Sequence, residues 1–265
     1  MTGIEVTLGE VAASLVLVAV AVAISRWRRA GLEADIGIAV IRSFLQLTAI
    51  GFVITAIFDV DSLLLVVVLL ATMVGFGAFT AGARAVGVPN ALGPLVIALS
   101  VSAVATIGLT LALGIFPATP RYLVPVGGMV IGNAMTASAV ALNRLGDEMR
   151  DQALAIEATL ALGATSRQAA EPAVRRALRS GTITLVDSTK TTGLIFFPGT
   201  MVGMLLAGAE PIDAVRLQLI LLYLLLGAVA ISALVATTLA YRNFFTPAHQ
   251  LKDLPDPGDE GGPGA

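Results

Sequence analysis

Long apolar stretches, separated by short polar connections, run through most of the chain. A helix that crosses ~30 Å of hydrocarbon needs about 20 mostly apolar residues, so stretches of that length bounded by charge, proline or glycine are candidate spans. Seven stretches qualify: 6–24, 36–58, 62–80, 91–116, 122–142, 182–207 and 214–240. The pattern predicts an all-α, polytopic membrane helix bundle with about seven transmembrane helices.

The composition agrees with a membrane protein and excludes several other classes. Of the 265 residues, 57% are hydrophobic and only 13% are charged, whereas soluble domains carry about 25% charged residues. The formal net charge of −2 gives no basic excess for binding nucleic acid. The chain has no cysteine and one histidine, which excludes disulfides, thiolate metal sites and multi-histidine metal centres.

The positions of lysine and arginine predict the orientation. Short cytoplasmic loops retain an excess of basic residues. With the N-terminus outside, 12 of the 16 basic residues lie in cytoplasmic segments, so we expect an outside N-terminus and a cytoplasmic C-terminus. The first stretch is preceded by acidic residues and followed by basic ones. This is the reverse of a signal peptide, so we expect a retained helix.

The large polar segment 143–181 is placed in the cytoplasm by this topology. Apolar residues at helical spacing predict a first helix that ends at Gly163. Thr165 and Gln168 have the spacing of a capping box that would begin a second helix, and Pro172 is expected to kink or break that helix. We therefore expect a helical elbow in the cytosol. An elbow of this kind could also lie on the membrane surface, with its arginines attracted to anionic lipid.

The end of the chain differs in composition from the rest. Proline, glycine and acidic residues are frequent in 246–265, which predicts a disordered cytoplasmic tail. The chain is thus expected to form one transmembrane domain, 1–245, that includes the cytoplasmic loop 143–181 and is followed by this tail.

Several polar side chains interrupt the predicted spans. An ionisable side chain near the centre of a membrane helix costs at least ~2.5 kcal/mol, so it needs a partner, a water-filled cavity or a role. Arg42, Asp187 and Lys190 lie six to nine residues from predicted cytoplasmic ends. Gln46 is one turn from Arg42, and Asn133 lies at a similar depth. These residues predict one polar layer, which either fixes helix packing or lines the cytoplasmic entrance of a transport pathway.

The charges of this layer bear on the substrate. Asp187 and Lys190 are three residues apart and can form an ion pair. Two cations and one carboxylate leave a formal charge of +1, which disfavours a bare divalent metal ion. Hard cations also prefer several oxygen ligands. On these grounds the sequence favours an anionic or chelated substrate, and it identifies no metal-ligating residues.

The sixth stretch contains a candidate hinge. Pro198 and Gly199 should bend or interrupt a helix there, because proline removes a backbone hydrogen bond. Gly199 with Gly203, and Gly128 with Gly132, form G-x-x-x-G pairs that let helices approach closely. Such pairs serve packing within one chain or a dimer interface.

The elbow also carries a family resemblance. Residues 157–163 resemble the EAA-x-x-x-G loop of ABC-transporter permeases, with Thr159 at the second alanine of that pattern. Further blocks look like the FetB family of ABC-type permeases, in the same order and over most of the chain: 120–135, 157–165, 187–194, 198–201, 206–208 and 241–245.

The resemblance implies a multi-pass permease subunit of the bacterial inner membrane, driven by a separate ATPase. In this superfamily the loop inserts into a groove of the ATPase and transmits its closure to the spans. The implied coupling residues are Glu157, Ala158, Leu162, Gly163, Ala164 and Thr165. The resemblance also implies a homodimer, because ABC permeases normally supply two membrane subunits.

The function that this resemblance implies is export of iron or another metal. Plant relatives are linked to aluminium tolerance, with UDP-glucose proposed as a transported molecule, so an anionic or chelated substrate such as a nucleotide sugar is an alternative. The chain has no G-x-x-x-x-G-K-[S/T] loop. We expect no cofactor in this chain, with ATP and Mg bound by the partner. A stand-alone secondary transporter that uses Asp187 protonation is a further alternative, whereas an intramembrane enzyme would lack a catalytic pair.

Overall fold

The computed structural model describes residues 8–60 and 62–252. Helices make up its regular structure, and the described residues contain no β-strand, only isolated bridges, so the all-α prediction is confirmed. The elements are α1 (Leu8–Arg28), α2 (Glu33–Val60), α3 (Leu63–Arg84), α4 (Leu92–Ala112), α5 (Pro120–Asp151), α6 (Ala153–Ala161), α7 (Ser166–Thr191), α8 (Gly199–Leu206), α9 (Pro211–Ala240) and a 3₁₀ helix, η1 (Tyr241–Phe244).

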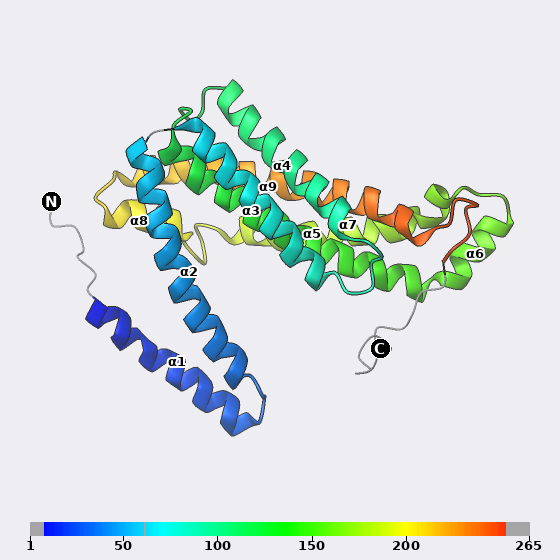
Figure 1. Ribbon diagram of the computed structural model, residues 1–265, viewed down its shortest axis with the longest axis horizontal. Helices are drawn as coiled ribbons and strands as arrows, with labels where there is room; N and C mark the ends of the chain where they lie inside the picture. Colours follow the sequence, from blue (N-terminus) through cyan, green and yellow to red (C-terminus); the bar gives the residue numbers. More distant parts are fainter. Residues whose placement is uncertain (1–7, 61, 253–265) are drawn as a thin grey trace.

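Helices α5 and α9 form the centre of the bundle (Figure 1). Helix α5 packs against α3, α4, α7 and α9, and α9 also packs against α4 and α7. Small residues dominate these contacts, including the fully buried Ala134, Ala228 and Ala236. Small side chains let membrane helices approach closely, so dispersion contacts can hold the bundle together without a hydrophobic driving force. The Ser102 hydroxyl adds a hydrogen bond of 2.7 Å from α4 to the Ala228 carbonyl oxygen of α9.

Helices α1 and α2 form a hairpin that extends away from this bundle (Figure 1). The end of α2 packs on the bundle through Ile57, which joins Val66, Leu123 and Val124 in a small apolar cluster. The rest of the hairpin exposes large apolar side chains. A surface of this kind is compatible with lipid contact, since lipid tails are as apolar as the side chains themselves.

Six helices of the described ranges are long and apolar enough to cross a membrane: α1 to α5, and α9 continued into η1. The sixth predicted stretch, 182–207, is not one helix. Helix α7 ends at Thr191 and α8 begins at Gly199, so this stretch is divided between two helices by a non-helical segment. An outside N-terminus and a cytoplasmic C-terminus stay predictions.

The elbow forms where it was predicted, with different boundaries. Helix α5 continues to Asp151 and α7 begins at Ser166, so α6 and two short turns remain between them. Pro172 was expected to kink or break the second helix. The predicted break is wrong, because α7 runs through Pro172 without interruption. Ala169, Ala170 and Ala173 are buried around this position, and their packing offsets the one hydrogen bond that proline removes.

Candidate functional site

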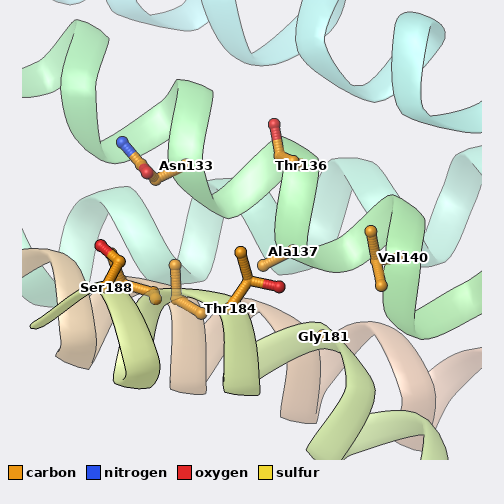
Figure 2. A pocket seen from close by; sticks show the side chains of 9 residues that line it. Asn133, Thr136, Ala137, Val140, Gly181, Thr184 and Ser188 are labelled. Atoms are coloured by element: carbon orange, nitrogen blue, oxygen red, sulfur yellow. The ribbon is translucent and has the colours of Figure 1, made fainter. Parts of the chain in front are cut away.

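A groove opens between α5 and α7 in the membrane part of the bundle. Its volume is ≈ 280 Å³, and its lining comes from α5, α7 and α9. Figure 2 shows Asn133 and Ser188 at one end, Thr184 in the middle, and Val140 and Gly181 at the other end. Asn133 donates a hydrogen bond of 2.9 Å to the Met129 carbonyl oxygen of its own helix. The groove therefore presents amide and hydroxyl groups, without a charged residue in its lining.

Close contact between α5 and α7 at the end of the groove nearer the elbow depends on Gly181. A Cβ atom on this residue would lie 2.7 Å from the Ala137 carbonyl oxygen and 2.8 Å from the Ala141 Cβ. By contrast, Cβ atoms on Gly132, Gly199 and Gly203 would meet no atom within 4 Å. These three members of the predicted G-x-x-x-G pairs thus do not mediate close packing within the described chain. Sequence spacing did not single out Gly181, which has no glycine four residues away.

The predicted ion pair between Asp187 and Lys190 forms, with 2.8 Å between Lys190 Nζ and Asp187 Oδ1. Both side chains are exposed, by 59% and 67%. At 100° per residue, Lys190 lies about 120° or more around α7 from the groove residues Thr184 and Ser188, whereas Asp187 is only about 60° from Thr184. Neither residue of the ion pair belongs to the groove lining, but Asp187 lies at the edge of the groove and Lys190 lies farther around the helix.

The ion pair lies well inside the membrane region. Gly181 faces Ala137, which is 17 residues after Pro120, the first residue of α5. At 1.5 Å per residue, Ala137 is about 26 Å from that end of the bundle. Asp187 is six residues further along α7, which runs in the opposite direction, and so lies about 17 Å from the same end. This is close to the middle of ~30 Å of hydrocarbon.

Arg42 and Gln46 are not brought to the groove. Both lie in the first half of α2, both side chains are exposed, and the groove is lined by other helices. The single polar layer expected from the sequence therefore does not form within one chain, because similar depth along two helices does not bring them side by side. A role in lining a transport pathway stays a prediction for the five polar residues of the expected layer: Arg42, Gln46, Asn133, Asp187 and Lys190.

Helix α7 is interrupted six residues before the predicted hinge. Thr192 leaves the helix with φ −60° and ψ 133°, and Gly193 has a φ of +84° that favours glycine. The Gly193 amide donates a hydrogen bond of 2.9 Å to the Phe196 carbonyl oxygen, which closes a short loop. Pro198 then caps α8 and Gly199 begins it. The predicted interruption is present, and Pro198 and Gly199 lie at its far end.

The turn between α6 and α7 is closed by hydrogen bonds on both sides. Gly163, with a φ of +89°, and Ala164 donate to the carbonyl oxygens of Leu160 and Thr159, which makes a Schellman motif. Thr165 and Gln168 form the predicted capping box at the start of α7. The elbow is therefore a locally defined structure.

One face of α6 packs on the bundle, and the other is open. Ile156 is 3% exposed, and Leu160 packs against the main core. Glu157 and Ala158 are exposed, and Leu162 and Leu154 are 89% and 84% exposed. Most of the predicted coupling residues thus lie on a surface that another protein can reach; Ala164 is half-buried. Leu154 was not predicted, although its apolar side chain within a polar loop is a signal that the sequence contains.

Residues 246–252, placed by the sequence analysis in the tail, form a turn beside the elbow. The Thr246 amide donates a hydrogen bond of 2.8 Å to the Gln250 carbonyl oxygen, and His249 shares a hydrogen bond with the Ser166 hydroxyl. This turn and α6 enclose a groove of ≈ 500 Å³ that is lined partly by Glu157. The rest of the predicted tail, 253–265, lies outside the described residues.

A buried charge cluster near the elbow was missed by sequence reasoning. Glu148 of α5 has a side chain only 4% exposed, and its Oε2 lies 2.6 Å from Arg176 Nε of α7. Arg144 and Gln152, one turn before and one turn after Glu148, bind the same carboxylate. The four-residue spacing of Arg144, Glu148 and Gln152 was visible in the sequence, but the contact with α7 was not.

The part of the chain that the structure describes contains no group of three or more His, Asp or Glu residues that could hold a metal ion. The groove lining is uncharged, and the nearby ion pair is neutral overall. The arrangement can bind a ligand through neutral hydrogen-bonding groups and can present a docking surface to a partner.

Comparison with known proteins places these features in a family. The model of an uncharacterised protein family, UPF0014, matches residues 8–245. The UPF0014 membrane protein STAR2 of Oryza sativa subsp. japonica is 42% identical over 241 residues, which is 91% of this chain and 85% of that protein. Protein ALUMINUM SENSITIVE 3 of Arabidopsis thaliana is also 42% identical, over 91% of this chain and 88% of its own length.

A bacterial relative extends the comparison. The Probable iron export permease protein FetB of Escherichia coli (strain K12) is 34% identical over 251 residues, covering 95% of this chain and 97% of that protein. No solved structure matches the chain. The match along nearly the whole chain, the apolar helices and the elbow agree with the resemblance drawn from the sequence, and the chain belongs to the UPF0014 family of multi-pass membrane permeases.

Proposed function

We propose that this chain is the membrane-spanning subunit of an ABC exporter and that a separate ATPase binds its elbow. The observation that carries the proposal is the open face of α6, where Leu162 and Glu157 are exposed at the end of a rigid turn. Helix α5 is 32 residues long, or about 48 Å at 1.5 Å per residue. It exceeds the ~30 Å of hydrocarbon and so holds the elbow clear of the membrane.

The same reasoning supports a homodimer. The Asp187–Lys190 pair is exposed at mid-membrane depth, and Leu194 and Ile195 of the interruption are exposed as well. Lipid cannot hydrogen-bond either the ion pair or non-helical backbone, so both need protein or a water-filled cavity beside them. A second copy packed against this face of α7 would supply that cover and a pathway between the two chains.

The proposed cargo is iron or another metal; the name of the FetB relative states iron export for that protein. The neutral lining of the α5–α7 groove favours a second candidate, a chelated or anionic substrate, because a bare metal ion would find no set of charged oxygen ligands there. Reconstitution with the cognate ATPase separates the two. Stimulation of ATP hydrolysis by metal ions, metal chelates and nucleotide sugars would be compared under identical conditions.

Docking at the elbow is tested by Leu162→Asp. A charged side chain at this apolar contact should weaken co-purification of the ATPase about tenfold or more, which corresponds to ~1.4 kcal/mol of binding free energy. Leu113→Asp is the matched control, since Leu113 is also an exposed leucine but lies at the opposite end of the bundle, after α4. Equal co-purification of both variants, or ATP-independent transport by vesicles that contain this chain alone, would contradict the proposal.

A further inference from the structure

The buried carboxylate of Glu148 lies where the elbow, α5 and α7 meet. It is in the last two turns of α5, and Gln152, which binds it, is the residue between α5 and α6. Arg176 reaches it from α7, with 2.6 Å between the two side chains. One carboxylate therefore contacts the start of the elbow and the helix that leads into the membrane.

This cluster is built differently from the ion pairs on the surface. The Glu148 side chain is 4% exposed, whereas Glu171, one turn before Arg175 on the outer face of α7, is 45% exposed. A buried carboxylate has lost its hydration and depends on its protein partners, so it holds them in fixed positions. A surface pair is hydrated and can separate freely. The Glu148 cluster is thus a rigid joint, and the Glu171–Arg175 pair is not.

The joint connects to the membrane groove through one continuous helix. From Arg176, α7 runs past Gly181, Thr184 and Ser188, which line the groove, and ends at Thr191, where the helix is interrupted. Because the helical hydrogen-bond ladder resists stretching and bending, displacement of Arg176 displaces the groove lining with it. The non-helical segment after Thr191 separates α7 from α8, so a displacement of α7 need not displace α8 by the same amount.

We propose that Glu148 is a positioning residue that transmits movement of the elbow to α7. When the ATPase moves α6, Gln152 moves with it, and the Glu148–Arg176 contact carries that movement into α7 and changes the groove. This inference rests on the proposed function and adds to it the residue through which the ATPase and the pathway are coupled. Glu148 contacts neither the ATPase surface nor the groove.

The natural absence of cysteine allows a direct test. Val140 lines the groove and is exposed, so Val140→Cys reports groove accessibility through its labelling by a water-soluble maleimide. In the full complex, we expect ATP to change the labelling rate about fivefold, the lower end of common coupling between sites. With Glu148→Gln added, this change should disappear, while ATPase co-purification and hydrolysis persist. Glu171→Gln is the matched control and should keep the full change.

The outcomes separate this inference from the proposed function. If the Glu148→Gln complex still shows the fivefold change, the joint is not the route and the inference is wrong. If Glu148→Gln does not fold or co-purify, Arg176→Lys decides, because it keeps the charge at a half-exposed position but loses the guanidinium Nε that binds Glu148. A reduced change then supports the inference, and an unaltered one overturns it. If the unmodified chain does not bind the ATPase, the proposed function itself is contradicted.

Discussion

Two of the ion pairs on helix α7 lie in opposite surroundings. In its first half, next to the elbow, Arg176 binds Glu148, whose side chain is 4% exposed. In its membrane half, Asp187 and Lys190 are paired but 59% and 67% exposed. The chain buries charge where water is available and exposes charge where lipid would surround it. The difference teaches that the surroundings of the Glu148 carboxylate are completed by this chain itself, whereas this chain leaves the Asp187–Lys190 pair uncovered.

The largest loss of stability is expected when the buried Glu148 carboxylate loses its partner Arg176. Arg176→Ala leaves the Glu148 carboxylate buried with less positive charge beside it, and we expect a loss of about 3 kcal/mol in the free energy of unfolding. Arg175→Ala, at the adjacent residue, removes only an exposed ion pair with Glu171 and should cost about 0.5 kcal/mol or less. Thermal unfolding in detergent measures both. Similar losses for the two variants would remove the distinction between buried and surface charge on α7.

A smaller loss of stability is expected where Gly181 of α7 packs against α5. Gly181→Ala places a methyl group 2.7 Å from the Ala137 carbonyl oxygen, so α5 and α7 must separate. We expect a loss of about 2 kcal/mol from overpacking. Gly203→Ala is the control, since its methyl group would meet open space. The same unfolding measurement applies, and an unchanged Gly181→Ala protein would show that the seam between the two helices is loose.

The smallest expected effect on stability concerns the exposed pair. Lys190→Ala should change the free energy of unfolding in detergent by less than about 1 kcal/mol, because both partners are already exposed. Transport should nevertheless fall about tenfold, equivalent to ~1.4 kcal/mol on the barrier, since an unpaired Asp187 remains at membrane depth. Measuring flux and unfolding on the same preparation sharpens the comparison. A large loss of monomer stability with normal flux would assign the pair to folding instead.

Local features of the elbow and the spans could be predicted from the sequence. Six of the seven apolar stretches correspond to helices long enough to span a membrane, and Thr165 with Gln168 forms the predicted capping box, because these features depend on residues close together in the chain. The ion pair of Asp187 and Lys190 was predictable for the same reason. Each of these features is settled by one helix and its termini.

Contacts between helices were harder to predict. Depth along α2 and α7 indicated a shared layer, but the lateral position of a helix depends on packing, and Arg42 does not reach the groove. The partner of Glu148 lies 28 residues away, on another helix. The interruption of α7 was assigned to Pro198, whereas the Thr191 and Thr192 hydroxyls donate to the Ser188 carbonyl oxygen at its start. Such bonds compete with the helix, and Gly193 completes its end.

The two caps that meet between α6 and α7 have a consequence for assembly. The Schellman motif and the capping box satisfy the backbone at the turn from residues of the chain itself. The elbow consequently has a defined shape in this chain alone, and association with the proposed ATPase would spend little free energy on ordering it. An unstructured loop of the same composition would have to fold in each encounter. The rate of binding to the proposed ATPase would then be governed by collision and orientation.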